Sequence, residues 1–413
     1  MANPSEPAGA EPPGRRLCPI LFALTLALLG WILVDSLPPA AQPAKGDDDY
    51  YLRYMQTVAA DGVSALPRLV EQWKATPRDR IFPPPTRVGY IVLTAAWGSA
   101  FGSTYRSLQT LSLAAFLLLC AVNYAFARRR FGEPRALFIG ALVGFSPLLM
   151  GLSRLALSDS CAALFTTSAV WLFLEVLDAP SSRAKRILFM AALAAMVLVK
   201  EISVLLVAPF LAFLLYERFA RRVPHDLRRF ALLFAIPGLV VAGILILAAG
   251  GPGPLWETAT IVLGSPRSNP YALRFGSGPW FRVVLDFLLL SPWPTLLAVG
   301  WFWLTAVRLR SGSYDRTSVY LAFVIATLTL ELSFFTKNVR YAAVLDLPIR
   351  VFAVLLVCEL CQRPRAKRGA ILAGGVVALL GCLDWQSFEL IWVQRAGYDP
   401  ITRFLGLVRH VIP

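Results

Sequence analysis

The amino-acid sequence predicts an all-α polytopic membrane protein with about eleven transmembrane helices. Of its 413 residues, 57% are hydrophobic and only 16% are charged, whereas about a quarter of the residues in soluble domains are charged. The mean hydropathy is +0.62. Apolar runs recur along the whole chain and are continuous rather than alternating, which indicates membrane helices instead of the strands of a barrel.

The charge and the cysteines fit this class. A net charge of +15 would suggest nucleic acid as the partner of a soluble protein, but Lys and Arg beside apolar segments are typical topology signals next to anionic lipid. We therefore expect no nucleic-acid partner. The six cysteines, including the Cys358 and Cys361 pair, fall within or beside apolar segments and are expected to pack as small apolar side chains. With His225 and His410 as the only histidines, any metal would need oxygen ligands.

The N-terminal region is expected to contain a disordered cytoplasmic segment and then the first span. Residues 1–16 are rich in Pro, Gly, Ala and Glu. Arg15 and Arg16 then precede an apolar run over 17–37. This run is compatible with a cleaved signal peptide, but an uncleaved first span makes the later topology consistent.

A transmembrane domain is expected over residues 17–388. With the N-terminus in the cytoplasm, alternating spans place every basic cluster in a cytoplasmic loop, from Arg128–Arg130 to Arg363–Arg368, as the positive-inside rule requires. This agreement supports the span count. After 17–37, the expected spans lie near 106–127, 136–153, 160–178, 186–200, 202–217, 229–250, 292–308, 317–336, 341–361 and 369–388.

The opposite, extracytoplasmic face is expected to hold a large helical first loop (38–105), a second large loop (251–291) and a short tail (389–413). In the first loop, residues 49–74 mix aromatic and charged side chains and predict an amphipathic interfacial helix. The prolines of FPPPT at 82–86 predict a rigid break. Residues 88–101 are apolar but too short to span comfortably, so we expect them to be interfacial or re-entrant.

Three consecutive carboxylates, Asp47, Asp48 and Asp49, stand in this first loop. Crowded carboxylates repel one another, and this repulsion can raise one pKa toward neutrality, as a general base requires. The same oxygens would suit a divalent cation. A solvated acidic turn that orders the loop is an equally good explanation of these three residues on composition alone.

Further charged residues are expected on the same face. Asp159 lies with Arg154 in a short turn between spans, and Lys337 and Arg340 stand where the positive-inside rule disfavours cations. These cations need an anionic partner, which could be the phosphate of a lipid-linked substrate, a lipid headgroup or Asp346. Lys200 and Glu201 are neighbours in a tight turn between spans. The simplest interpretation of Glu201 is that it neutralises the charge of Lys200.

Together these motifs resemble those of GT-C glycosyltransferases, integral-membrane enzymes that use polyprenyl-phosphate sugars. The resemblance runs from about residue 15 to 360 and is nearest to the branch of protein O-mannosyltransferases and the lipid A aminoarabinose transferase. It rests on DDDYYLRYMQTVAADG at 47–62, the PPPTRVGYIVLTAAWGSAFGSTYRSLQTLSLAAF segment, YAFARRRFGEPRALFIGALVGFSPLLMGLSRLALSD, SPWP at 291–294 and KNVRYAAVLDLP at 337–348.

The resemblance implies site residues by position. Asp47 is the first choice for a general base, although Asp replaces the usual Glu in the acidic pair and the register of Asp47, Asp48 and Asp49 stays open. The resemblance leaves open a divalent cation, Mg or Mn, with Asp48 and Asp159 as candidate ligands. The implied catalytic residues are Asp47, Asp48 and Asp159; the implied substrate-binding residues are Asp49, Tyr50, Lys200, Lys337, Arg340 and Tyr341.

The implied activity is inverting transfer of a sugar from a polyprenyl phosphate to a glycan, lipid or protein acceptor at the extracytoplasmic face of a bacterial inner or plasma membrane. A transporter or flippase of a polyprenyl-linked lipid, or a non-catalytic subunit of an envelope glycan complex, is the alternative. Transporters more often bury charges at mid-membrane, whereas the charges singled out here gather in loops on one face, which favours an enzyme.

Overall fold

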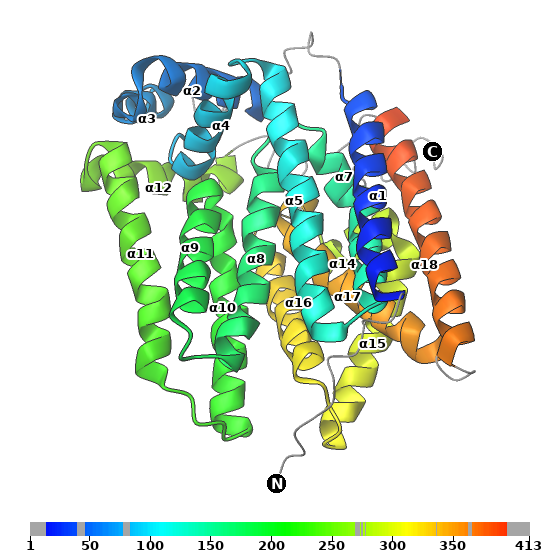
Figure 1. Cartoon of the computed structure of the whole chain (residues 1–413). Helices are drawn as coiled ribbons and strands as arrows, with labels where there is room; N and C mark the ends of the chain where they lie inside the picture. Colours follow the sequence, from blue (N-terminus) through cyan, green and yellow to red (C-terminus); the bar gives the residue numbers. More distant parts are fainter. Residues whose placement is uncertain are drawn as a thin grey trace, which may run out of the picture.

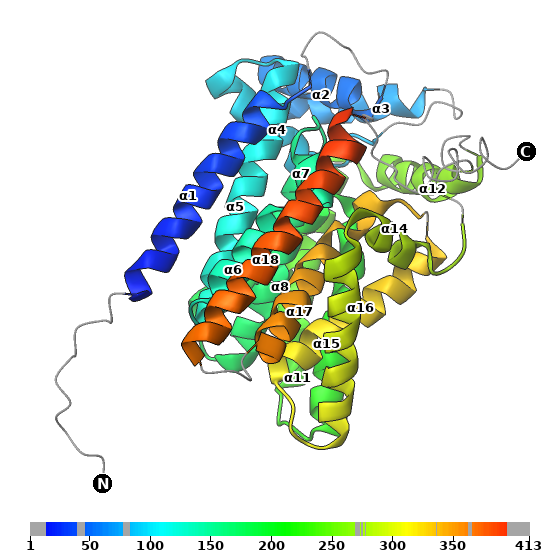
Figure 2. The same ribbon diagram turned by 90° about the vertical axis from the view of Figure 1, so that its right-hand side faces the viewer.

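The computed structural model describes residues 14–38, 46–76, 83–268, 273, 276, 278–335, 337–361 and 366–394, and all regular structure in them is helical. Long helices stand side by side, and the short helices α2 (Asp47–Asp61), α3 (Leu66–Lys74) and α4 (Val88–Phe101) cover their upper end (Figure 1). The same cover is seen from the side in Figure 2. Residues 1–13 and 395–413, where the disordered N-terminus and most of the tail were expected, lie outside the described part.

Each expected span coincides with a helix or with consecutive helices, but their number as membrane spans is not confirmed. By length and composition, the described residues contain seven candidate spans, or eight if one bent pair is counted. The seven are α1 (Gly14–Asp35), α5 (Tyr105–Phe131), α8 (Asp159–Asp178), η3 with α10 and η4 (Glu201–Leu206, Val207–Leu215, Tyr216–Ala220), α11 (Leu227–Ala249), α16 (Arg316–Phe334) and α18 with η6 (Ala366–Phe388, Glu389–Gln394).

The remaining expected spans depart from a simple apolar helix for identifiable reasons. The span expected at 136–153 is broken into α6 (Arg135–Gly144) and α7 (Pro147–Ser153), which meet at 54°. Proline fits the first turn of a new helix, and Pro147 begins α7 after Ser146, whose side chain caps it. The other expected positions are occupied by α9 (Arg183–Val199), α15 (Pro292–Arg310) and α17 (Ala343–Cys361). By length and composition these three helices are not candidate membrane spans.

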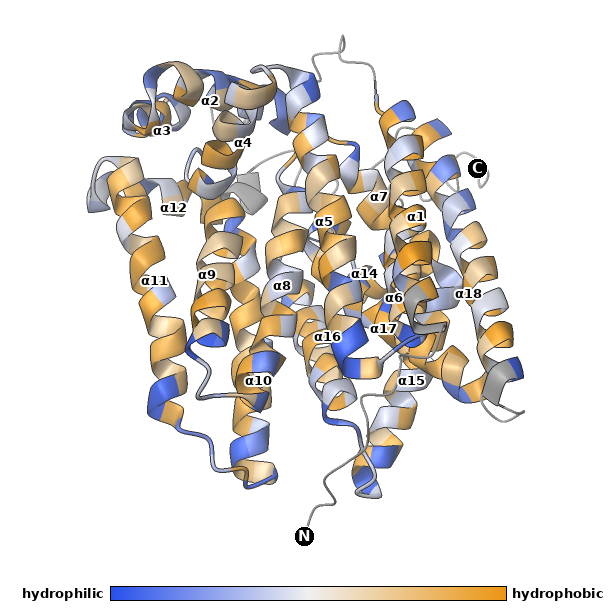
Figure 3. Cartoon of the chain, in the orientation of Figure 1, coloured by the Kyte–Doolittle hydropathy of each residue, from blue (hydrophilic) through white to orange (hydrophobic). Residues whose placement is uncertain are grey.

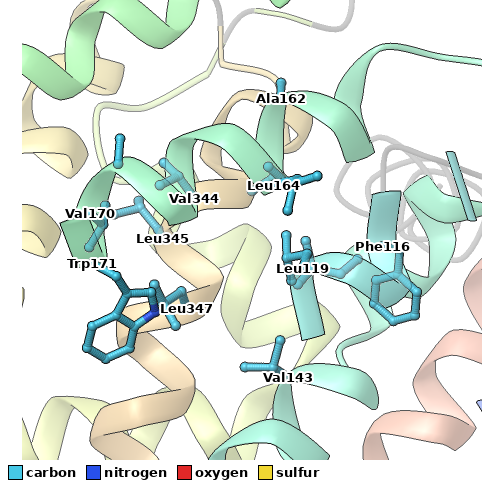
Figure 4. Packing of buried hydrophobic residues seen from close by; sticks show 14 of the residues in the cluster. Phe116, Leu119, Val143, Ala162, Leu164, Val170, Trp171, Val344, Leu345 and Leu347 are labelled. Atoms are coloured by element: carbon cyan, nitrogen blue, oxygen red, sulfur yellow. The ribbon is translucent and has the colours of Figure 1, made fainter. Parts of the chain in front are cut away.

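The hydropathy of the helices identifies an integral membrane protein. Apolar residues dominate the middle of the helices, whereas hydrophilic residues gather at the ends (Figure 3). Large apolar side chains such as Leu24, Leu239 and Ile371 are exposed on the outside of the bundle, where lipid would cover them. Helices α8 and α17 form the enclosed centre with α5 and α6, and their buried side chains interlock in Figure 4.

The expected amphipathic segment of the first loop is helical. Helix α2 ends at Asp61 and is followed by Gly62, whose φ of +74° is unfavourable for other residues and whose N–H donates to the Val58 carbonyl. A short 3-10 turn, η1 (Val63–Ala65), then leads into α3. The apolar stretch 88–101 forms α4, and the second loop contributes α12 (Pro252–Ser268) and α14 (Arg282–Leu290).

At the end opposite α2, an ionic network joins α5, α8, α9, η4 and α16. We call it the distal network. Lys185 Nζ lies 2.5 Å from a Glu175 oxygen, and Arg316 donates to Glu217 at 2.6 Å through two nitrogens. Positive and negative side chains alternate in this network and share partners, so the hydrogen-bonding groups of all its members are satisfied together. Its members are Arg130, Glu175, Asp178, Lys185, Glu217 and Arg316.

A second ionic group is enclosed inside the bundle and is called the buried triad. Arg350, at 0% exposure, donates to Asp346 at 3.3 Å and also to Asp384. Ser291 donates to the other Asp384 oxygen at 2.7 Å. The triad ties α17 to α18, and it removes Asp346 as the expected partner of Lys337 or Arg340 because Arg350 occupies that carboxylate.

Candidate active site

Several residues expected at the site meet beneath α2. Arg340, on the 3-10 turn η5 (Val339–Ala342), lies with Nη2 3.5 Å from Asp47 Oδ2 and Nη1 3.7 Å from Asp159 Oδ2. Lys200 Nζ donates to the other Asp159 oxygen at 2.5 Å and lies 4.8 Å from the centre of the Tyr341 ring. These residues, Asp47, Asp159, Lys200, Arg340 and Tyr341, are called the charged cluster.

Helix ends bring the charges of this cluster together. Asp47 is the first residue of α2 and Asp159 the first residue of α8, where the positive end of the helix dipole favours carboxylates. Lys200 directly follows the last residue of α9, where the dipole favours a cation. Burial strengthens these interactions, because Asp159 and Lys200 are 3% and 4% exposed.

The other acidic residues of the first loop have different partners. Asp48 is buried, and one of its oxygens accepts a hydrogen bond from the Tyr105 hydroxyl at 3.0 Å. Burial raises the pKa of the Asp48 carboxyl, partly offset by the Tyr105 hydrogen bond. Asp49 instead pairs with Arg53 at 2.9 Å on the exposed side of α2.

Three further residues lie outside the charged cluster. The Tyr50 ring lies beside Tyr54 and under the Arg53 guanidinium. The Lys337 backbone N–H donates to the Gly276 carbonyl, and its side chain forms no ion pair with any residue that the structure describes. Arg154 donates to the Ser36 and Trp392 carbonyls, so it ties the ends of α1 and η6 together.

Sequence reasoning missed a second polar group beside the cluster. Arg87 donates through Nε and Nη2 to both Glu201 oxygens, at 2.7 and 2.6 Å, and through Nη1 to the Tyr51 hydroxyl at 2.5 Å. The Tyr51 hydroxyl also lies 3.3 Å from Ser158 Oγ. We call Tyr51, Arg87, Ser158 and Glu201 the Arg87 clamp.

The Arg87 clamp corrects one expectation. Lys200 and Glu201 do not neutralise each other: Lys200 pairs with Asp159, and Glu201 pairs with Arg87. The available signal was Arg87 itself, a cation in the expected extracytoplasmic loop. Like Lys337 and Arg340, it stands where the positive-inside rule disfavours a cation and therefore needs an anionic partner.

A cavity opens directly from the charged cluster. Asp159, Lys200, Arg340 and Tyr341 form its polar end, and apolar residues of α8, η3, α16 and α17 form its walls. Its free volume is about 30 Å³, room for one or two water molecules. The apolar wall consists mainly of Ala162, Ala163, Ile202, Leu205, Leu206, Leu328, Leu332, Ala343 and Val344.

The expected carboxylates do not fit a divalent-cation site. The Asp159 oxygens face Lys200 and Arg340, and an Asp48 oxygen accepts from Tyr105, so positive or donor groups already occupy the positions that a metal would need. In the part of the chain that the structure describes, no three His, Cys, Asp or Glu side chains come together as a metal cluster.

Comparisons with known proteins agree with this architecture. Residues 90–241, fewer than half of the chain, match the family model of dolichyl-phosphate-mannose-protein mannosyltransferase. A comparison with curated proteins gives no match.

Two solved structures have similar folds. ArnT from Cupriavidus metallidurans, bound to undecaprenyl phosphate, superposes with a TM-score of 0.57 at 16% identity, over 88% of this chain and 63% of that one. Oligosaccharyltransferase AglB from Archaeoglobus fulgidus, in complex with an inhibitory peptide and a dolichol-phosphate, gives 0.61 at 14% identity, over 92% and 56%. The chain thus spans less than two thirds of either neighbour. At these identities the likeness establishes the fold alone: the chain shares the helical membrane fold of the ArnT and AglB structures, which confirms the GT-C-like fold expected from the sequence.

Proposed function

We propose that the protein is an inverting glycosyltransferase that moves a sugar from a polyprenyl phosphate to an acceptor at the α2 end of the bundle. The observation that carries the proposal is the charged cluster, in which a partly exposed carboxylate, Asp47, lies within 3.5 Å of a cation beside an apolar-walled cavity. A general base and an anion-binding group in one place are the parts that this reaction needs.

The cations would hold the phosphate of the donor. Arg340 presents a planar guanidinium and Lys200 a compact ammonium, and both recognise phosphate oxygens. The cavity walls next to them are apolar, as a prenyl chain requires. Because the free volume is only about 30 Å³, the donor head can enter only if side chains move. The lipid phosphates bound to the ArnT and AglB structures support this choice of donor.

In the proposed reaction, Asp47 accepts the proton of an acceptor hydroxyl or amine. The acceptor atom forms a bond to the anomeric carbon from the side opposite the phosphate, and the bond between that carbon and the phosphate oxygen breaks. The electron pair leaves with the polyprenyl phosphate, whose charge Arg340 and Lys200 stabilise. Asp48 is the alternative base, because burial raises its pKa.

The remaining assignments follow from position. Asp49, Tyr50 and Lys337, which stand outside the charged cluster, are proposed to contact the acceptor or the sugar, and Tyr341 to border the donor phosphate. Arg128, Arg129 and Arg130 end α5 at the opposite end of the bundle, and this basic run supports a cytoplasmic location for that end and an extracytoplasmic active site in a bacterial inner or plasma membrane.

The test is sugar transfer by the purified protein. Polyprenyl-phosphate sugars are incubated with candidate glycan, lipid and protein acceptors, and products are identified by mass spectrometry. Asp47→Asn should reduce transfer by about 100-fold or more, since general bases contribute about 10²–10⁴-fold. Asp61→Asn, an exposed carboxylate on the same helix that pairs with Arg68, is the matched control and should retain transfer.

Two outcomes would overturn the proposal. Undiminished transfer in both Asp47→Asn and Asp48→Asn would remove the general-base assignment. Movement of a fluorescent polyprenyl phosphate across vesicles, without sugar transfer to any acceptor, would identify a transporter instead.

A further inference from the structure

Arg87 is almost fully enclosed and uses its whole guanidinium in the protein. Its side chain is 11% exposed, and Nε, Nη1 and Nη2 all donate hydrogen bonds. A bidentate arginine–carboxylate pair has a fixed geometry, because the two planar groups face each other. Arg87 therefore sets the distance between η3, which carries Glu201, and α2, which carries Tyr51.

Those partners stand beside the charged cluster in the chain. Tyr51 is one helical turn after Asp47 on α2, and Ser158, within reach of the Tyr51 hydroxyl, directly precedes Asp159. Glu201 directly follows Lys200. The Arg87 clamp thus contacts the segments that supply Asp47, Asp159 and Lys200.

Close helix packing lets Arg87 reach Glu201. Gly89, two residues later, lies at the start of α4 against the end of α9, where an added Cβ would come within 2.9 Å of Leu198 Cβ. A side chain at position 89 would push α4 away from α9, and Arg87 from Glu201 with it.

The charged cluster does not fix α2 by itself. The Asp47–Arg340 pair is long, at 3.5 Å, and the Asp47 side chain is 33% exposed. Partly exposed pairs of this kind contribute little to holding a geometry. The contacts of Arg87 are shorter, at 2.5–2.7 Å, and one of them ends on the buried Tyr51 hydroxyl of α2, so they are the stronger link between α2 and the bundle.

We propose that Arg87 is a positioning residue for sugar transfer: through Tyr51 and Glu201 it sets where the α2 carboxylates stand relative to Asp159 and Lys200. This inference rests on the proposed function. Orientation of reacting groups contributes strongly to rate, and a displacement of about 1 Å can cost about 100-fold. Loosening the clamp should therefore slow the chemical step without weakening the hold of Arg340 and Lys200 on the donor.

The test removes one hydroxyl at a time from α2. Tyr51→Phe keeps the ring, which packs 4.7 Å from Tyr90, but loses the acceptor of Arg87. Tyr54→Phe is the matched control: Tyr54 is also buried, and its hydroxyl donates to the Pro83 carbonyl instead of contacting Arg87. We expect Tyr51→Phe to lower kcat about tenfold with the donor KM within about twofold of wild type, and Tyr54→Phe to leave both unchanged.

A second pair of variants separates positioning from charge balance. Arg87→Gln leaves Glu201, whose side chain is 42% exposed, without its cation and takes one donor from the buried Tyr51 hydroxyl, so it should lower the Tm, whereas the double variant Arg87→Gln/Glu201→Gln should recover the Tm. If Arg87 positions α2, kcat stays low in the double variant. Recovery of kcat together with the Tm would show that Arg87 only neutralises Glu201, and would overturn the inference.

Hydrogen–deuterium exchange gives a readout that does not depend on activity. Amides of residues 47–61 should exchange faster in Tyr51→Phe than in Tyr54→Phe. Equal exchange with unchanged kcat in an active enzyme would refute the clamp. Faster exchange in a protein that transfers no sugar from any polyprenyl phosphate would instead refute the proposed function and leave the placement of α2 by Arg87 standing.

Discussion

Asp159 balances two buried cations, and replacing it by Asn tests whether the charged cluster is built for an anion. The side chain is 3% exposed, with Lys200 at 2.5 Å and Arg340 at 3.7 Å. Asn has nearly the same shape but no charge. Asp159→Asn therefore takes the close carboxylate from Lys200 and removes one of the two carboxylates beside Arg340.

The expected loss follows from these distances. With an effective dielectric constant of about 20, Coulomb's law gives roughly 7 kcal/mol for the Lys200 contact and roughly 4 kcal/mol for the Arg340 contact, before desolvation is subtracted. Measured costs of removing one partner from a buried ion pair are about 3–5 kcal/mol. We expect Asp159→Asn to reduce the free energy of unfolding by that smaller amount.

The assay is thermal unfolding of the purified protein in detergent, with and without added undecaprenyl phosphate. The phosphate should raise the Tm of Asp159→Asn more than that of the wild type, because the incoming anion replaces the missing charge and binds only the folded protein. Asp61→Asn, an exposed carboxylate paired with Arg68, should respond as the wild type does.

Two results would refute this reasoning. An unchanged Tm in Asp159→Asn would mean that the two cations do not need the carboxylate. A lower Tm with no added response to undecaprenyl phosphate would mean that the cluster does not accept a lipid phosphate.

Two further predictions concern buried carboxylates. Because burial raises the pKa of Asp48, protonation of this carboxyl favours folding, and that contribution is lost as the pH rises through the raised pKa. Asp48→Asn should therefore have a higher Tm than the wild type at pH 7 and a smaller difference at pH 4. An equal or lower Tm of the variant at pH 7 would contradict this. In the buried triad, Arg350→Met leaves Asp346 and Asp384 unbalanced and should cost about 3–5 kcal/mol, whereas Asp384→Asn leaves a neutral pair and should cost less; equal losses of Tm would contradict the charge balance.

Much of the fold was predictable because a lipid environment restricts the choices. A continuous apolar run must satisfy its backbone internally, so each expected span coincides with helix. The helical first loop was predictable because residues 49–74 mix aromatic and charged side chains, as an amphipathic interfacial helix does. The break between α6 and α7 was missed because the sequence there, FSP, lies within an otherwise apolar run.

The charged cluster was predictable in membership but not in pairing. Topology placed Asp47, Asp159, Lys200 and Arg340 on one face, and the structure brings them together. The partners of Glu201 and Asp346 were misassigned because pairing depends on how helices far apart in the chain pack: Arg87 reaches Glu201 across 114 positions. No local pattern records such a contact.

The distal network has a mechanical consequence for how the molecule opens. The network shares its charges among α5, α8, α9, η4 and α16. Sliding one of these elements alone would leave charged groups of its neighbours without partners, so the five elements are held together at this end. If the helices tilt about the distal network, their displacements grow with distance from it. If the proposed donor binds, we expect its head group to enter by separation of the helices at the α2 end, with little change at the distal network.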